Sequence, residues 1–172
     1  MAKLYILCGY PFAGKSTIAK ALINKYGFVR VAIDDIKKEQ GIVDNVSEEI
    51  TAEELQGVYD IYQDRIVNNL KSGKSVITDT VAHTRESRDG LRKIAKENNA
   101  ETVILYVNTP LDIVKERWMK NRNTQERNDV LDKDFNSVVN NFEVPGNDEN
   151  VKIVSNAMPI EEIYKLIHLV DV

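Results

Sequence analysis

The chain has 172 residues and one cysteine, Cys8, so it fits a single domain over 1–172 and forms no internal disulfide. Hydrophobic residues make up 42% and charged residues 29%, as in soluble globular proteins, and the apolar run Leu4–Cys8 is too short for a signal peptide or a membrane span. The net charge of −4 argues against an extended nucleic-acid surface. Together, these features predict a cytoplasmic protein without membrane contact, a monomer or small homo-oligomer.

Strands and helices are predicted to alternate along the chain. In chain order we expect a strand at 3–8, a helix at 15–26, a strand at 29–33, a helix at 51–70, a strand at 75–80, a helix at 85–98, a strand at 100–107, helices at 110–122 and 130–142, a strand at 151–154 and a helix after Pro159. Thr51 with Glu54 forms a capping box, and Thr109 is expected to cap the 110–122 helix. This alternation favours a parallel sheet with helices on both faces.

The segment between the first strand and the first helix reads Gly9-Tyr-Pro-Phe-Ala-Gly14-Lys15-Ser16 and matches G-x-x-x-x-G-K-[ST]. Its glycines let the backbone curl around phosphates, its lysine reaches the β- and γ-phosphates, and its serine hydroxyl ligates Mg²⁺. The position between an apolar strand and an amphipathic helix disfavours a chance match. We therefore predict ATP and Mg²⁺ as cofactors, bound by Gly9, Tyr10, Pro11, Phe12, Ala13, Gly14, Lys15, Ser16 and Thr17.

Acidic residues follow two later strands. Asp79 ends the strand at 75–80, where a P-loop site needs a carboxylate for the metal, and capping of the next segment is the alternative. Asp34 and Asp35 follow the second strand and would face the γ-phosphate across the crevice at the strand ends. We interpret Asp34 as a general base or hydroxyl ligand, and Asp35 as a helix cap that also lies near the substrate.

Three arginines fall at the end of the 110–122 helix and in the polar loop 121–128. Arg117, Arg122 and Arg127 can supply guanidinium groups to the charge that develops during phosphoryl transfer. Arg117 and Arg122 are five residues apart, so both contribute only if the helix ends between them. The alternative is a solvated basic helix end. We predict a mobile lid over 117–129, with Arg117 binding nucleotide and Arg122 and Arg127 acting in catalysis.

The order of these motifs resembles the P-loop kinases grouped around polynucleotide 5′-hydroxyl kinases, with zeta toxins and chloramphenicol phosphotransferases as more distant relatives. The resemblance runs from Lys3 to about Asn150 and is closest at Gly9–Thr17, Val31–Lys37, Ser75–Ala95 and Thr109–Arg127. The fold expected is the three-layer P-loop NTPase α/β fold, with a five-stranded parallel sheet in the order 2-3-1-4-5. Carried over by position, the resemblance implies phosphate and Mg²⁺ binding by Lys15 and Ser16, a base at Asp34, a metal-site acid at Asp79, a lid arginine at Arg122 or Arg127, and substrate contacts by Lys37 and Arg88.

Two departures from that group bear on the acceptor. Lys37 stands where an arginine is expected, and Val81 stands where an asparagine is expected. We predict a phosphotransferase that moves the γ-phosphoryl group of ATP to an acceptor hydroxyl on a small molecule, a nucleotide or a nucleic-acid 5′ end, with 5′-hydroxyl oligonucleotides weaker than small hydroxyl compounds. The alternatives are a nucleotide-dependent switch or binding ATPase without an acceptor, and a zeta toxin-like sugar-nucleotide kinase.

Overall fold

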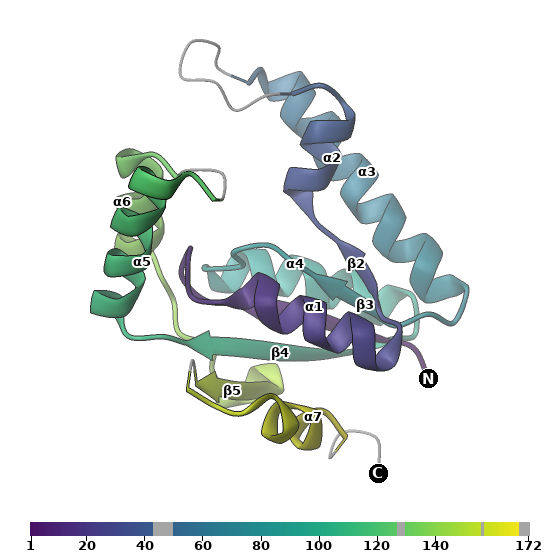
Figure 1. The fold of residues 1–172 in the computed structure, drawn as a ribbon. Helices are drawn as coiled ribbons and strands as arrows, with labels where there is room; N and C mark the ends of the chain where they lie inside the picture. Colours follow the sequence, from purple (N-terminus) through teal and green to yellow (C-terminus); the bar gives the residue numbers. More distant parts are fainter. Residues whose placement is uncertain (43–49, 127–129, 156, 169–172) are drawn as a thin grey trace.

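One parallel sheet carries all the predicted functional segments. The structure is a computed structural model that describes residues 1–42, 50–126, 130–155 and 157–168. Its strands lie in the order β2-β3-β1-β4-β5, which confirms the predicted parallel sheet and its order (Figure 1). The strands are β1 (Lys3–Cys8), β2 (Val29–Val31), β3 (Val76–Thr78), β4 (Glu101–Asn108) and β5 (Val151–Ser155).

The central strand β1 is buried along its whole length. Its Leu4 pairs with Val76 of β3 on one side and with Thr102 of β4 on the other. Because successive side chains of a strand point to opposite faces, Tyr5 and Leu7 join one hydrophobic core, and Leu4, Ile6 and Cys8 join the other. A strand that is covered on both faces needs apolar side chains along its whole length, which explains the apolar run in β1.

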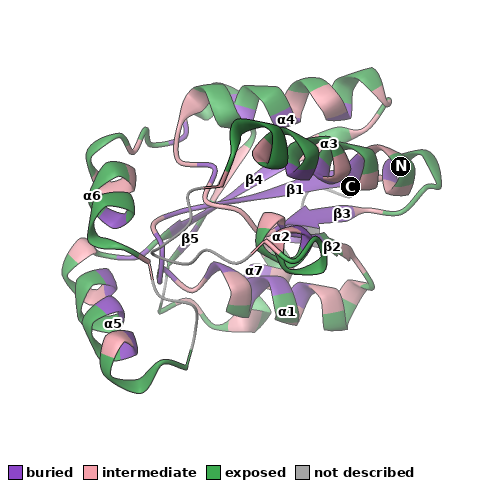
Figure 2. Ribbon diagram, turned by 90° about the horizontal axis from the view of Figure 1, so that it is seen from above, coloured by how far each residue is buried: buried purple, intermediate pink, exposed green. Residues whose placement is uncertain are grey.

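Helices cover both faces of the sheet. The helices are α1 (Lys15–Tyr26), α2 (Ile33–Glu39), α3 (Ala52–Lys71), α4 (Arg85–Glu97), α5 (Leu111–Thr124), α6 (Asp132–Asn140) and α7 (Ile160–His168), with a 3-10 turn, η1, at Asn147–Glu149. α1 and α7 contribute to the core with Tyr5, and α3 and α4 to the core with Leu4, so the helices turn buried faces toward the strands (Figure 2). None of the described helices combines the length and hydropathy of a transmembrane segment.

Two pairs of helices rise at the carboxyl side of the sheet. α2 and α3, here the α2–α3 arm, stand above β2 and β3, and α5 and α6, the α5–α6 arm, stand beyond the end of β4 (Figure 1). Arg65 of α3 makes a bidentate contact with Glu39 of α2, which holds the first arm together. The loop after β1 lies between the two arms, so ligands bound there are flanked by both.

Several boundaries of strands and helices differ from the prediction. β2 ends at Val31 and α2 begins at Ile33 with Ala32 as its N-cap, so the strand expected at 29–33 is too long. Pro110, not Thr109, is the N-cap of α5, because the Thr109 hydroxyl instead donates to the Ala13 carbonyl at 2.7 Å. α5 continues to Thr124, two residues beyond the predicted end. The predicted capping box of Thr51 and Glu54 is confirmed at α3.

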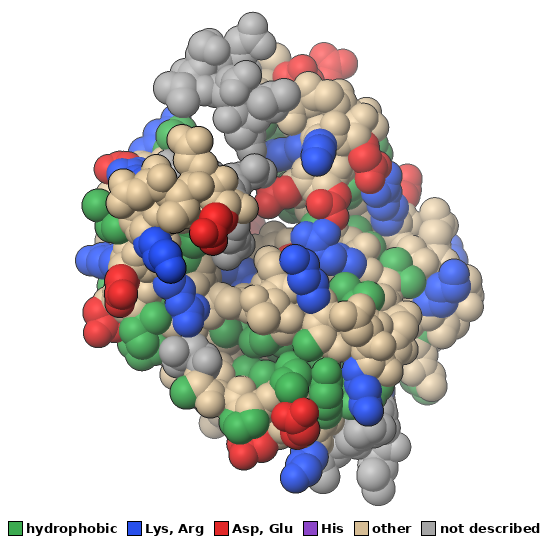
Figure 3. Space-filling model, in the orientation of Figure 1, with side chains coloured by type: hydrophobic (Ala, Val, Ile, Leu, Met, Phe, Trp, Pro, Cys, Tyr) green, Lys and Arg blue, Asp and Glu red, His purple; other side chains and the backbone are tan. Residues whose placement is uncertain are grey.

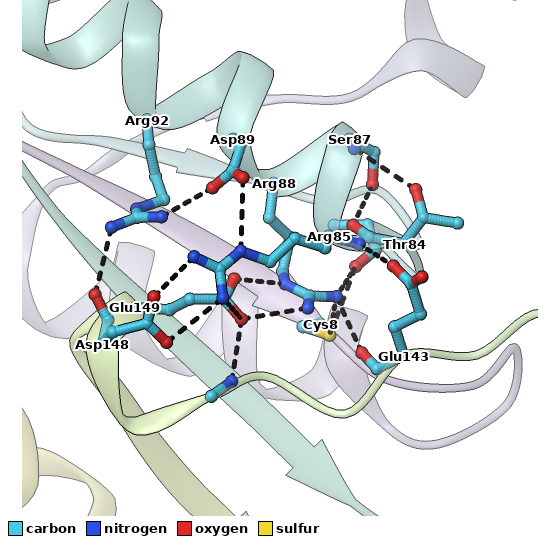
Figure 4. A network of polar contacts seen from close by, with 12 residues as sticks. Cys8, Thr84, Arg85, Ser87, Arg88, Asp89, Arg92, Glu143, Asp148 and Glu149 are labelled. Carbon is cyan, nitrogen blue, oxygen red and sulfur yellow. Dashed lines mark hydrogen bonds and ion pairs between the residues drawn. The ribbon is translucent and has the colours of Figure 1, made fainter.

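A buried ion pair ties the segment between α6 and β5 to α4. Arg88 and Glu149 are both fully buried, and Arg88 Nε and Nη2 donate to the two Glu149 carboxylate oxygens at 2.7 and 3.1 Å (Figure 4). The remaining nitrogen, Nη1, donates to the carbonyls of Ala82 and Glu143 at 3.2 and 2.9 Å. The prediction that Arg88 contacts the substrate is wrong, because its guanidinium is enclosed and all three of its nitrogens bond to protein oxygens.

This pair predicts a large stability loss for Arg88→Met. The substitution leaves the Glu149 carboxylate buried without its counter-charge, so the free energy of unfolding in urea should fall by roughly 3–5 kcal/mol. Arg92→Met on the same helix is the control, because Arg92 is partly exposed and pairs with Asp89, and it should cost about 1 kcal/mol or less. Equal losses for the two variants would contradict the importance given to the buried pair.

Candidate active site

The glycine motif forms a tight loop between β1 and α1. Gly9 and Gly14 have φ values of 150° and 107°, and a Cβ at Gly9 would lie 2.8 Å from the Val107 carbonyl oxygen, so only glycine fits there. Lys15 Nζ donates to the carbonyls of Gly9 and Tyr10 at 2.9 and 2.7 Å, which draws its ammonium group back over the loop. The predicted phosphate-binding residues Gly9–Thr17 thus lie together in this loop and the first turn of α1.

Ser16 and Asp79 bring a hydroxyl and a carboxylate together beside this loop. Ser16 Oγ donates to Asp79 Oδ1 at 3.3 Å, and the Asp79 side chain is 6% exposed just after β3. Mg²⁺ prefers oxygen ligands and is often held by one or two side chains together with substrate phosphates. The described residues include no group of three or more His, Cys, Asp or Glu that could hold a metal. Thr84 caps α4, so the alternative that Asp79 caps this helix is wrong.

Arg30 links the Asp79 carboxylate to α2. Its Nε and Nη2 donate to Asp79 Oδ2 at 3.0 and 2.9 Å, which leaves Oδ1 on the side of Ser16. Its Nη1 contacts the Asp35 carboxylate in the first turn of α2. Burial alone would lower the pKa of Arg30, but hydrogen bonds and the charges of the two aspartates raise it above its ordinary value. The prediction that Asp35 caps the helix is wrong, because Ala32 is the N-cap and the Asp35 carboxylate binds Arg30.

Asp34 and Lys37 lie on α2 at the same end of the sheet. Asp34 is exposed in the first turn of the helix, next to Asp35, and Lys37 is half-buried one turn later. Because Asp35 is connected through Arg30 to Asp79, the first turn of α2 belongs to the same set of connected side chains as Ser16. The roles of Asp34 as a base and Lys37 as a substrate contact stay predictions.

A cavity of 650 Å³ opens on the other side of the loop, between α1, α5 and α7. Arg117 of α5 lines it and donates from Nη1 to the Phe12 and Ala13 carbonyls at 3.2 and 3.3 Å. Apolar side chains from three parts of the chain form much of the wall, namely Ile18, Ala21, Val107, Met158, Ile160 and Ile163. A cavity with both apolar and polar walls next to a phosphate-binding loop suits a nucleoside.

The three lid arginines have different positions. Arg122 lies over the Trp118 ring, with Cζ 4.3 Å from the ring centroid, and forms an ion pair with Asp132 of α6. A hydrogen bond from Arg122 lowers the pKa of Asp132. α5 does not end between Arg117 and Arg122, so Arg117 is the one that the helix directs to the loop. Arg127 and part of the lid predicted over 117–129 lie outside the described residues.

Two residues of the site were not assigned to it from the sequence. Arg30 lies on a strand of three residues, too short for an alternating pattern to indicate where its side chain points. Thr109 was interpreted as a cap, yet its hydroxyl supports the loop through the Ala13 carbonyl. The sequence could have indicated Arg30 only through its neighbours. An arginine on an edge strand next to two predicted acidic sites can pair with their carboxylates.

Comparison with known proteins gives a family and several similar chains. A family model described as an AAA domain matches residues 4–145. The chain is 30% identical over 118 residues to shikimate kinase of Persephonella marina (strain DSM 14350 / EX-H1), which covers 68% of this chain and 67% of that protein.

Two solved structures share the fold. A sugar kinase from Janibacter sp. HTCC2649 superposes with a TM-score of 0.71 at 19% identity, covering 99% of this chain and 95% of that chain. The Pnkp1/Rnl/Hen1 RNA repair complex contains a chain that superposes with a TM-score of 0.69 at 23% identity, covering 81% of this chain and 43% of that chain. At these identities the structures establish likeness of fold alone.

The loop geometry predicts that nucleotide stabilises the protein through Lys15. ATP with Mg²⁺ at about a hundred times its Kd should add about 2.7 kcal/mol, which raises the melting temperature by roughly 5–10 °C. Lys15→Ala should abolish most of this shift in a thermal unfolding assay. Lys20→Ala is the control, because Lys20 is exposed on the same helix and should leave the shift intact. Equal shifts in wild type and Lys15→Ala would refute the assignment of the loop.

The contacts of Arg117 predict that it outweighs Arg122 in nucleotide binding. Arg117→Met removes a charged donor beside the loop and should weaken ATP binding roughly tenfold, as expected for a charge-assisted hydrogen bond. Arg122→Met should change ATP affinity less than threefold and instead loosen the contact of α5 with α6. Isothermal titration measures both, and the reverse ranking would show that Arg122 is the nucleotide contact.

Proposed function

The chain belongs to the AAA domain family of P-loop proteins, and we propose that it is a kinase that transfers the γ-phosphoryl group of ATP to the hydroxyl group of a small acceptor. The observation that carries this proposal is the chain of contacts that joins Ser16, Asp79 and the first turn of α2 through Arg30. Similarity to shikimate kinase supports phosphoryl transfer from nucleotide as the chemistry.

ATP would occupy the loop and the cavity beside it. The loop backbone and Lys15 would hold the β- and γ-phosphates at the N-terminus of α1, where the helix dipole favours anions. The nucleoside would lie in the 650 Å³ cavity, with Arg117 at the border between the nucleoside and the phosphates. This arrangement directs the γ-phosphate toward the crevice and the α2–α3 arm.

Mg²⁺ fits the oxygen pair of Ser16 and Asp79. When bound there with the nucleotide, Mg²⁺ would neutralise charge on the phosphate oxygens. Arg30 binds Asp79 Oδ2 through two N–H groups, so it fixes the carboxylate with Oδ1 facing Ser16. Asp79 would therefore be oriented by protein contacts and need not reorganise when nucleotide arrives.

Asp34 is the proposed general base. The acceptor hydroxyl oxygen would form a bond with the γ-phosphorus, the bond from this phosphorus to the β–γ bridging oxygen would break, and ADP would leave. The hydroxyl proton would pass to the Asp34 carboxylate. Asp35 is less suited to this role because its carboxylate already binds the Arg30 guanidinium.

The acceptor would enter on the side of the α2–α3 arm. The residues that line the nucleoside cavity come from the loop, α1, β4, α5, α7 and the segments next to them, and include none from α2 or α3. In-line transfer needs the acceptor on the opposite side of the γ-phosphate from ADP. A small acceptor is favoured over a polynucleotide end because Lys37 and Val81 replace the arginine and asparagine of the polynucleotide kinases that the chain resembles.

The base assignment predicts separate effects on binding and turnover. Asp34→Asn should keep ATP affinity within a few-fold and lower turnover about 10²-fold or more, as expected for loss of a general base. Transfer from labelled ATP to the best acceptor measures turnover, and isothermal titration measures affinity. Asp64→Asn, on α3, is a control for the loss of one negative charge from the arm. Unchanged turnover in Asp34→Asn together with lost turnover in Asp35→Asn would show that Asp35 is the base.

A further inference from the structure

Acidic residues outnumber basic ones in the described part of the chain that would face the acceptor. Residues 30–42 and 50–71, which include the α2–α3 arm, hold seven Asp or Glu and five Lys or Arg, a net charge of −2. Figure 3 shows acidic side chains on the visible face of this arm, some of them bordering the hollow between the arms. The described part of the α2–α3 arm thus carries a net negative charge.

The arginines on this side are bound by carboxylates. Arg30 uses Nε and Nη2 on Asp79 and Nη1 on Asp35, so each of its nitrogens has a carboxylate partner. Arg65 is held by both oxygens of Glu39, and this hydrogen bonding raises the pKa of Arg65. Arg85 and Arg88, which follow on α4, bind Asp148 and Glu149 in the same way.

Paired guanidinium groups are poor receptors for a further anion. Phosphate and carboxylate groups are recognised most strongly by arginines that offer two parallel N–H donors. To bind either arginine of the arm, an anionic ligand would have to displace Asp35 or Glu39, and it would do so next to the remaining negative charges of the arm. A cationic or uncharged ligand meets neither obstacle, and the field of the arm attracts a cation.

We propose that the acceptor is a small hydroxyl compound without phosphate, sulfate or carboxylate groups, and that amine-bearing acceptors are preferred. This inference rests on the proposed kinase function and specifies its substrate class. Asp35 is then a specificity-determining residue, because its carboxylate withholds the outer edge of the Arg30 guanidinium from anions. Shikimate is a carboxylate at neutral pH, so the acceptor proposed here differs in charge from the compound that gives the similar kinase its name.

The test compares acceptors that share a scaffold and differ in charge. Glucosamine, glucose and glucuronate, then ribose and ribose 5-phosphate, then shikimate and a 5′-hydroxyl oligonucleotide, are offered with labelled ATP as part of a wider panel of hydroxyl compounds in the same charge classes. The best amine-bearing or uncharged compound should have a kcat/KM at least tenfold above that of the best anion. An anion that equals or exceeds it, or a panel in which no amine-bearing or uncharged compound accepts phosphate, would overturn the proposal.

Variants test the residue that carries the argument. Asp35→Asn keeps the shape of the side chain but releases Arg30, so the ratio of kcat/KM for anionic to uncharged acceptors should rise at least threefold and fall again with added salt. Asp60→Asn removes the same charge from α3, where Asp60 accepts a hydrogen bond from Gln56, and should leave the ratio unchanged. If Asp35→Asn does not fold, the same ratio is measured in Glu39→Gln, which releases Arg65. A ratio that shifts equally in Asp60→Asn, or in no variant, would refute the role of arginine pairing.

The outcomes separate this inference from the kinase proposal. A protein that shows Lys15-dependent stabilisation by ATP and transfers phosphate best to shikimate or to the oligonucleotide is a kinase with a different acceptor class. Loss of that Lys15 dependence would refute the kinase proposal itself.

Discussion

The Asp79 carboxylate is the point at which the segments of the site meet. One oxygen accepts a hydrogen bond from Ser16 at the start of α1, and the other binds Arg30 on β2, whose third nitrogen reaches Asp35 on α2. The loop after β1, the end of β3 and the first turn of α2 are thereby held in one arrangement. Because the Asp79 side chain is nearly buried, it needs these partners, and its need for counter-charge fixes the relative positions of α1, β2 and α2.

The parts of the fold that depend on local chemistry could be predicted from the sequence. Alternating strands and amphipathic helices specified the parallel sheet, since each element shows its own hydrophobic period. The glycine motif predicted the tight loop between β1 and α1, because its backbone conformation needs glycine at Gly9. The position of Asp79 beside Ser16 could be predicted as well, because the carboxyl ends of parallel strands lie at the same edge of a sheet.

The parts that depend on long-range pairing could not be predicted. Arg88 has the spacing of a substrate-binding arginine, yet its partner Glu149 lies 61 residues away and no local pattern reveals it. Asp35 has the sequence position of a cap, but the nearby Arg30 offers a stronger contact than the backbone does. Arg122 likewise packs on Trp118 and pairs with Asp132. The pair with Asp132 depends on how α6 lies beside α5, which no local pattern predicts.

The two ends of the α5–α6 arm are anchored to the sheet by different means. At its start, the buried Thr109 hydroxyl binds the Ala13 carbonyl, and beyond its end Glu149 is locked to Arg88. A hinge at Thr109 would have to break a buried hydrogen bond, whereas an exposed contact such as that of Arg122 with Asp132 can exchange at little cost. Motion within the arm therefore costs less than motion of the arm about its start.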